Sequence, residues 1–434
     1  MPTPTPWRPA ALAAVLSCAC APAESNAWTS SGGASDDEEL ASPDATPGVC
    51  GDGWVNLGEA CDDGVNNGAY GRCEPGCVAL APSCGDAQVH PPYEGCDDGR
   101  NDGTYGGCLP DCSGPAAHCG DGRVDEAEMC DDGNDADGDG CNHDCVESGS
   151  VLWTQRPEDL TGSAVAVAIT RGGRSVAAFE GGVVRGLEAH GPARWEAIFD
   201  GAAVRAAAGS VGGRATLVGA RDGAAWRVEL DDAGQTVRAV AGAAGEYIAV
   251  AVGPDALAVS TKSVLSIRVG PDEWASTALG PGSPRAIALL DTSVVVAGGG
   301  PETPASVARY SWGGARVWAS AVSREGAATD VGIAPDGSVR AVASGQLLSL
   351  DPGGDLVWIA DIPGAAALTV LTEGDAVVAG EEGSIARVGG TGTLRWSRSL
   401  PEVTTLSDVA SDTEDRIVAA GAAAPHPVVL AFAP

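Results

Sequence analysis

The sequence predicts an all-β protein: a seven-bladed β-propeller, with six or eight blades as alternatives, preceded by three small cysteine-rich modules with little regular secondary structure. Two repeats carry this prediction. Cysteines recur in groups of four from residue 50 to residue 145, and tryptophans recur at steps of about 40 residues from 153 to 396. Composition separates the two parts, since residues 1–150 carry −24 of the net charge of −34 and residues 151–434 contain no cysteine.

Residues 1–20 have the order of a secretory signal. Arg8 precedes the apolar run Ala10–Leu16, and a small residue, Ser17, follows. The run is far shorter than the roughly 20 residues that span a bilayer. Val-Leu-Ser-Cys, ending at Cys18, resembles the lipobox of bacterial lipoproteins, and this resemblance implies that Cys18 is lipidated and begins the mature chain. Cleavage further on, after Ala23 or Ala27, and an uncleaved start both stay open.

Residues 21–49 are rich in Ser, Asp, Glu, Pro and Gly and predict a flexible acidic linker, because such a segment cannot bury a core. The net charge of −34 and the single lysine, Lys262, argue against binding of nucleic acid or of an anionic membrane surface. We therefore expect an extracytoplasmic protein, either secreted or an outer-membrane or cell-surface lipoprotein, that touches a membrane only through a lipid anchor.

Three modules, residues 50–77, 84–112 and 119–145, repeat at a period of 34 to 35 residues. Each reads Cys-Gly-Asp, then Glu-x-Cys-Asp-Asp-Gly, then Cys-x-x-x-Cys. About 30 residues rich in Gly and Asp cannot offset their chain entropy by burial, so four cysteines behind a secretion signal predict two disulfides per module. The predicted disulfide cysteines are Cys50, Cys61, Cys73, Cys77, Cys84, Cys96, Cys108, Cys112, Cys119, Cys130, Cys141 and Cys145.

The sequence leaves the pairing within each module open among three possibilities. A zinc knuckle is the rival interpretation, but structural zinc sites usually have two close cysteine pairs, whereas each module has one. The repeated pattern resembles the cysteine-rich repeat of myxobacterial surface proteins over about 96 residues. That family has no established activity, so the resemblance implies none.

Module three contains the most acidic turn of the chain. Asp135, Asp137 and Asp139 stand at the first three ligand positions of an EF-hand-type loop, followed by Gly140 at the glycine position. The twelfth position, which needs a bidentate Glu, is Val146. One interpretation is a weak structural calcium site; the other is that Asp and Gly alternate because tight turns need them. No other cofactor is expected.

Residues 150–434 form the predicted propeller. Trp recurs at residues 153, 195, 274, 318, 358 and 396, and Val237 fills the one gap, so that the steps are 37 to 44 residues. Each unit reads as four short strands with turns between them and without helical periodicity, which is typical of propeller blades. The last unit lacks its fourth strand. We expect residues 150–153 to supply it and to close the ring.

These units resemble quinoprotein-type (PQQ-like) propeller repeats, and no Trp-Asp dipeptide occurs. The resemblance implies that the repeated tryptophans pack between neighbouring blades as structural residues: Trp153, Trp195, Trp274, Trp318, Trp358 and Trp396. A quinoprotein dehydrogenase would need eight blades, calcium ligands, a catalytic Asp and usually a vicinal disulfide. The predicted propeller has no cysteine and only two histidines, His190 and His426.

The sequence thus favours a non-enzymatic surface scaffold or binding protein over an enzyme. The propeller would bind a protein or glycan partner at the cell surface, the cysteine modules would form a stalk, and the chain would be a monomer. No catalytic or cofactor-binding residue is assigned. The alternative is a secreted propeller enzyme, a lyase, a hydrolase or a quinoprotein-like enzyme, which would require polar side chains to converge at one mouth of the channel.

Overall fold

A computed structural model describes residues 49–434 apart from 211, 271–272, 280–281, 291, 301–302 and 324–325. The predicted signal segment, Cys18 and the predicted linker up to residue 48 lie outside the described residues. The chain divides into two compact units between Ser83 and Cys84. Module one belongs to the first unit, and modules two and three belong to the second unit together with the β-strands. Within the described residues, no helix has the length and apolar character that crossing a membrane requires.

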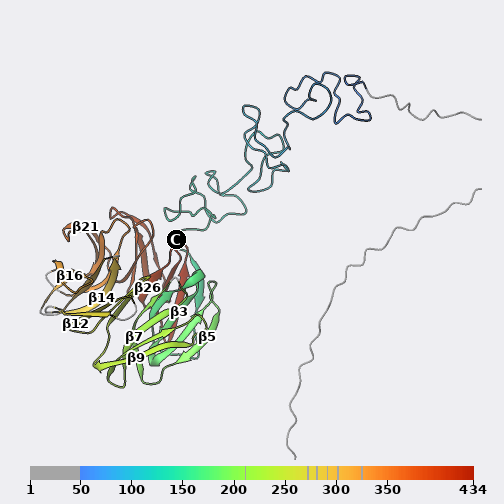
Figure 1. The fold of residues 1–434 in the computed structure, drawn as a ribbon. Coiled ribbons are helices and arrows are strands. Elements are labelled where there is room, and N and C mark those ends of the chain that lie inside the picture. Colours follow the sequence, from blue (N-terminus) through green and yellow to red (C-terminus); the bar gives the residue numbers. More distant parts are fainter. Residues whose placement is uncertain are drawn as a thin grey trace, which may run out of the picture. The chain divides into compact units, whose positions relative to one another are not determined.

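The described strands form seven four-stranded antiparallel sheets arranged as the blades of a ring, which confirms the predicted seven-bladed propeller (Figure 1). Six blades are built from consecutive strands. Blade one comprises β2 (Ala164–Ile169), β3 (Ser175–Phe179), β4 (Val183–Leu187) and β5 (Ala193–Ile198). Blade two comprises β6 (Ala202–Gly209), β7 (Ala215–Arg221), β8 (Ala224–Leu230) and β9 (Thr236–Ala244). Blade three comprises β10 (Ala249–Val252), β11 (Ala256–Ser260), β12 (Val264–Val269) and β13 (Glu273–Ala278).

Blade four comprises β14 (Ser283–Leu290), β15 (Ser293–Gly300), β16 (Thr303–Ser311) and β17 (Arg316–Ser323). Blade five comprises β18 (Ala328–Ile333), β19 (Val339–Ala343), β20 (Gln346–Leu350) and β21 (Leu356–Asp361). Blade six comprises β22 (Ala365–Val370), β23 (Ala376–Gly380), β24 (Ser384–Val388) and β25 (Leu394–Ser399). Two 3-10 turns, η1 (Arg171–Gly173) and η2 (Glu180–Gly182), join strands of blade one.

Blade seven closes the ring. It contains β26 (Thr405–Ser411), β27 (Ile417–Ala423), β28 (His426–Phe432) and, beside β28, the first strand of the chain, β1 (Val151–Gln155). β1 runs antiparallel to β28, with Thr154 opposite Leu430. The expected closure by the N-terminal strand is therefore confirmed, and it covers an edge of β28 that would otherwise offer free backbone groups.

The hydrophobic core lies between neighbouring blades. Second strands such as β23 and β27 are continuous apolar runs that are buried throughout, because a blade is covered on both faces. Fourth strands such as β21 alternate between exposed and half-buried residues. Val377 and Ile385 of blade six pack with Leu406 and Ile417 of blade seven, which shows how each interface draws on two blades.

Four of the repeated tryptophans join one blade to the next through their indole N–H. Each donates to a carbonyl in the turn between the third and fourth strands of the following blade. The pairs are Trp153 with Ala189 O at 2.8 Å, and Trp195 with Asp232 O, Trp318 with Pro352 O and Trp358 with Gly390 O, each at 3.0 Å. Two residues beyond each carbonyl stands a glycine with positive φ, where any Cβ would press on the indole. This approach explains the recurring Gly of the repeat.

Trp274 and Trp396 are placed differently. The guanidinium groups of Arg227 and Arg268 lie 5.2 and 5.7 Å from the Trp274 ring centre, an arrangement suited to cation–π attraction. Trp396 packs on Gly149, which precedes β1 and donates its N–H to Ala433 O at 3.1 Å. In blade seven the segment that leads into β1 therefore stands where other blades have a turn. The Trp396 indole N–H has no acceptor there.

That segment also joins module three to blade six. Arg398 donates to Ser148 O at 2.7 Å and forms an ion pair with Glu147 at 2.9 Å. Gly138 of module three lies against the buried guanidinium of Arg387, where a side chain would clash. Arg387 is otherwise held by Asp375 at 2.9 Å. Module three is thus packed on the propeller.

All twelve cysteines of the modules form disulfides, as predicted, and the pairing is nested: the first cysteine joins the fourth and the second joins the third. The six bonds are Cys50–Cys77, Cys61–Cys73, Cys84–Cys112, Cys96–Cys108, Cys119–Cys145 and Cys130–Cys141. The sequence alone does not select this pairing.

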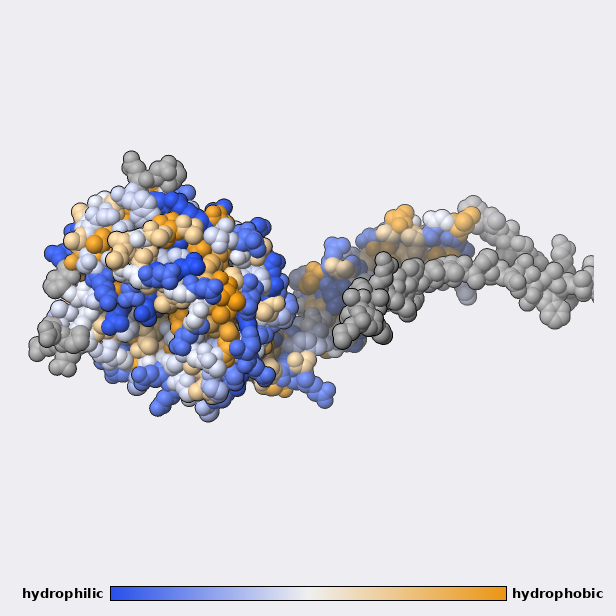
Figure 2. Space-filling model, turned by 90° about the horizontal axis from the view of Figure 1, so that it is seen from below, coloured by the Kyte–Doolittle hydropathy of each residue, from blue (hydrophilic) through white to orange (hydrophobic). Residues whose placement is uncertain are grey.

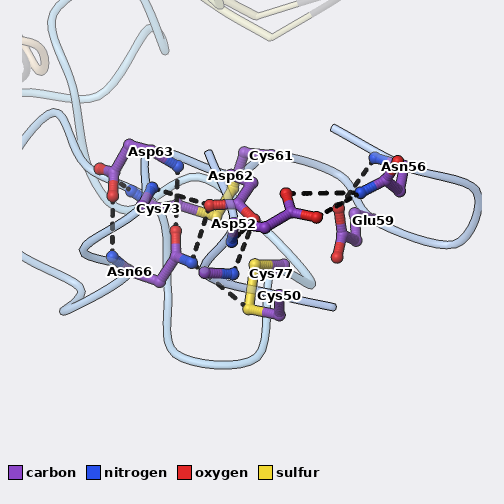
Figure 3. Close-up of a disulfide and its surroundings, with 12 residues drawn as sticks. Cys50, Asp52, Asn56, Glu59, Cys61, Asp62, Asp63, Asn66, Cys73 and Cys77 are labelled. Atoms are coloured by element: carbon purple, nitrogen blue, oxygen red, sulfur yellow. Dashed lines mark hydrogen bonds between the residues drawn. A yellow bond between two sulfur atoms is a disulfide. The ribbon is translucent and has the colours of Figure 1, made fainter. Parts of the chain in front are cut away.

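The paired aspartates after the second cysteine organise each module by accepting backbone hydrogen bonds. In module one, Asp62 accepts from Gly51 N at 2.6 Å and Gly64 N at 2.7 Å, and Asp63 accepts from Cys73 N at 3.0 Å (Figure 3). Partial burial opposes ionisation of Asp62, but its hydrogen bonds, first those from Gly64 and Asn66, lower the pKa to about 2. The hydrogen bonds to these carboxylates hold the turns of the small module together, a role that a hydrophobic core has in a larger domain.

Candidate binding site at one mouth of the propeller channel

The first strands of the blades line a central channel, and the two mouths of the channel differ. Where these strands end, there is a hollow of about 680 Å³ lined mostly by turns. Three of its charged groups are paired, since Arg416 lies 2.6 Å from Asp412 and 2.7 Å from Glu414, and the nearby Asp415 accepts from Thr372 N at 2.8 Å. Arg171, which also lines this hollow, is exposed, and its side chain forms no ion pair or hydrogen bond among the described residues. Among those residues, this mouth therefore offers a ligand one unpaired cation.

Two aspartates, Asp330 on β18 and Asp408 on β26, lie along the channel. Each follows the extra residue of a β-bulge and uses both carboxyl oxygens. Asp330 accepts from its neighbour Val331 N at 2.8 Å and from Leu368 N of the next blade at 2.7 Å. Asp408 accepts in the same way from Val409 N at 2.9 Å and from Val167 N at 2.8 Å.

These bonds satisfy the backbone N–H groups that the bulges release from the ladder in four consecutive blades. Burial raises the pKa of Asp330 to about 7 and that of Asp408 to about 8, with the Asp330 charge adding to the effect on Asp408, while the backbone hydrogen bonds act in the opposite direction. Both residues are half-buried. Each carboxyl accepts hydrogen bonds from its own blade and from the next one, so the two aspartates join neighbouring blades.

This pair gives the first testable prediction, a loss of stability with rising pH. Because their folded pKa values lie above the usual 3.8, these two carboxyls bind more protons in the folded chain than in the unfolded chain, and their contribution to stability, present below about pH 4, is lost as pH rises through 7 to 8. In a chain with Asp330→Asn and Asp408→Asn, this pH-dependent loss is absent. The melting temperature of the variant minus that of the parent should therefore increase from pH 5 to pH 8.5. Thermal melts across that range measure the difference.

The exposed Asp255→Asn chain is the control for this comparison. Its melting temperature should follow the parent at every pH. A double variant whose difference from the parent stays constant with pH would show that the two channel carboxyls do not titrate there.

The other mouth, where the first strands begin, carries basic side chains from three consecutive blades. Arg205 on β6 and Arg285 on β14 are the extra residues of β-bulges, so the bulge turns each side chain out of the ladder. Lys262 comes from the turn between β11 and β12. Together with Glu246 and Ile248, these residues line a hollow of about 380 Å³.

Among the described residues that line this hollow, the charges are not balanced. Glu246 accepts from Arg205 at 2.9 Å and lies 3.6 Å from Lys262, and the hydrogen bond from Arg205 is the main cause of its lowered pKa. The side chains of Arg205 and Lys262 are 55% and 70% exposed. Arg285 is exposed and makes no ion pair or hydrogen bond among the residues that the structure describes. One acidic side chain thus faces three basic ones.

A second hollow of about 670 Å³ adjoins the first and shares Glu246 and Lys262 with it. Small side chains such as Ala220, Ala225 and Ala243 line it, together with the half-buried Tyr247. We call the two hollows together the basic groove. The groove is defined by these lining residues. Figure 2 shows hydrophobic and hydrophilic residues interspersed over one face of the propeller.

The structure places two of the predicted calcium ligands, Asp137 and Asp139, with other partners. Asp137 accepts from the backbone N of His143 at 2.9 Å, and its carboxylate lies 2.8 Å from Nδ1 of the His143 ring. The contact with the ring raises the pKa of His143. Burial and the neighbouring Asp132 raise the pKa of Asp139. Among the described residues, the three carboxylates Asp135, Asp137 and Asp139 do not form one close cluster of ligand atoms. Calcium binding there stays a prediction.

Close groups of possible ligands occur instead at one repeated position in the modules, where a Glu, an Asp and a Cys converge. They are Glu59, Asp62 and Cys77; Glu94, Asp97 and Cys112; and Glu128, Asp131 and Cys145. Each cysteine is oxidised, and the carboxylates accept backbone hydrogen bonds, for example Glu59 from Asn56 N at 2.8 Å. Their geometry therefore serves the module fold.

The predicted propeller histidines do not lie in the basic groove. His426 faces Leu160 O at 2.9 Å, and His190 is exposed in a turn. Sequence reasoning missed Arg205 and Arg285. Aligning the first strands of the repeats would have brought the two arginines to the same position, but the bulge that turns them outward has no clear mark in the sequence.

Comparisons with known proteins identify the fold of the strand-rich part and nothing finer. No family model matches the chain, and no curated protein matches it in sequence. Among solved structures, the chain is similar to the crystal structure of the WD40 β-propeller domain of Doa1, at 12% identity and a TM-score of 0.55, over 65% of this chain and 96% of that one. The resemblances to quinoprotein-type and myxobacterial repeats stay predictions.

Proposed function

We propose that this chain is a non-enzymatic binding protein of the cell surface or outer membrane, in which the propeller holds a protein or glycan partner and the cysteine modules link it to its anchor. Six disulfides favour an oxidising, extracytoplasmic environment. The propeller fold, which commonly mediates binding, supports a binding role. The signal-like start and Cys18 support attachment through a lipid.

The observation that carries this proposal is the basic groove. Its cations stand on strands or tight turns of three blades, and a frame of this kind fixes the backbone positions from which the binding groups extend. Arg285 has no partner of its own among the described residues, and one carboxylate, Glu246, serves both Arg205 and Lys262. A ligand could therefore supply the missing negative charge.

The enzyme alternative would place its chemistry in the channel, where Asp330 and Asp408 have pKa values raised toward neutrality. Each of these carboxyls, however, accepts two backbone hydrogen bonds and ties two blades together. This engagement favours a structural role for the pair, and the binding function is the one that we propose.

Capture from envelope extracts tests the proposed function. The immobilised full-length chain should retain a specific protein or glycan, and a chain with Lys262→Ser and Arg285→Ser should lose it. A chain with Arg238→Ser and Arg316→Ser removes the same charge from the outer strands β9 and β17 and should retain the component. Turnover of a small molecule by the parent chain, without stable capture, would overturn the proposal in favour of an enzyme.

A further inference from the structure

The basic groove has a chemical character that narrows the class of ligand. We propose that it binds an acidic saccharide whose sugar rings carry carboxylate groups, with Arg285 and Lys262 contacting a carboxylate and Tyr247 lying along a sugar ring. This inference rests on the proposed binding function and specifies the ligand of the same site.

Charge is the first argument. Residues 151–434 contain 31 acidic and 21 basic residues, so a local excess of basic side chains runs against the composition of the domain. Arg205, Lys262 and Arg285 converge on one hollow in which Glu246 is the one acidic lining residue among those that the structure describes. A planar guanidinium matches the geometry of a carboxylate with two parallel hydrogen bonds, and Arg285, which has no partner among the described residues, can form them.

Size and lining form the second argument. Hollows of about 380 and 670 Å³ are in the range of small-ligand and oligosaccharide sites, whereas a standard protein partner covers a broad and mostly flat surface. The alanines of the second hollow leave room close to the backbone. Tyr247 presents an aromatic ring with an apolar body and a polar tip, which suits a sugar ring that is apolar on its faces and polar at its edge.

The two hollows place these features side by side. Glu246 and Lys262 belong to both, so an elongated ligand could reach from the cationic end into the alanine-lined end. Glu246 then has a role besides pairing with Arg205: it occupies one side of the cationic hollow and can accept a hydrogen bond from a sugar hydroxyl. A saccharide with alternating carboxylates and hydroxyls uses both kinds of group.

Binding of defined probes by the full-length chain tests the inference. Isothermal titration compares an oligogalacturonate, a dextran sulfate of similar length, a neutral dextran and a poly-glutamate peptide. The oligogalacturonate should bind most tightly. Lys262→Ser with Arg285→Ser should weaken its binding by at least about tenfold, and Arg285→Lys, which keeps the charge but loses the planar fork, should weaken it by less. Arg238→Ser with Arg316→Ser should leave the affinity unchanged.

Each contrary result is informative. Preference for dextran sulfate would assign a sulfated ligand, and preference for poly-glutamate would assign an acidic protein segment; either result overturns the inference. Equal weakening by the groove variant and the control variant would show unspecific attraction and would also overturn it. If no probe binds while envelope extracts still yield a component that depends on Lys262 and Arg285, the saccharide assignment fails and the proposed binding function stands.

Discussion

A variant of the chain from which only β1, residues Val151–Gln155, is deleted should unfold at least about 10 °C below the parent chain or associate through the edge of β28. Without β1 the ring cannot close, because blade seven loses its fourth strand. Val429 and Leu430, which are almost fully buried, would then lie beside an open edge. Trp153 would no longer donate to Ala189 O across the junction between blades seven and one. Differential scanning calorimetry and light scattering measure the two outcomes.

The matched control keeps the strand and removes one exposed apolar side chain from it. Leu152 is 55% exposed, so Leu152→Ser should melt within about 2 °C of the parent chain. A deletion variant that stays monomeric and melts with the parent would mean that the closing strand contributes little, and the account of ring closure would be wrong.

Reduction of the disulfides should unfold the three modules and leave the propeller folded. In the chain-entropy description, the loops of 26 to 28 residues and of 11 or 12 residues contribute about 3.5 and about 2.8 kcal/mol each. A module without a sizeable hydrophobic core has little else to replace that contribution. Residues 150–434 contain no cysteine, so their strands should be unaffected. Hydrogen exchange with and without reductant compares the two regions.

Loss of amide protection is expected over residues 50–145, and protection in β23 and β27 should persist. A chain with Cys130→Ala and Cys141→Ala should show the loss in module three without any reductant. Protection that survives complete reduction would contradict the expectation. Loss caused by EDTA in the absence of reductant would instead favour the zinc interpretation of the cysteine pattern.

Local periodicity carried most of the fold prediction. A blade is a repeated pattern within about 40 residues, and one Trp or its substitute marks each copy, so blade number and ring closure could be counted along the chain. The four cysteines of each module likewise predicted disulfides, because the modules lack other means of stabilisation. Their nested pairing could not be predicted, since it depends on how Asp62 and its counterparts fold the turns around the sulfurs.

The candidate site required tertiary structure. Arg205, Lys262 and Arg285 are 57 and 23 residues apart along the chain, and each alone is an ordinary surface residue. Asp330 and Asp408 likewise occupy equivalent positions in two blades, with another blade between them. By itself the sequence predicted the four-stranded repeat, a count of seven blades with six or eight as alternatives, and the disulfides of the modules, because those follow from local patterns. Only the closed ring decided which side chains meet at a mouth. Each blade is rotated relative to the one before it, and this rotation around the ring brings together residues that are far apart in the sequence.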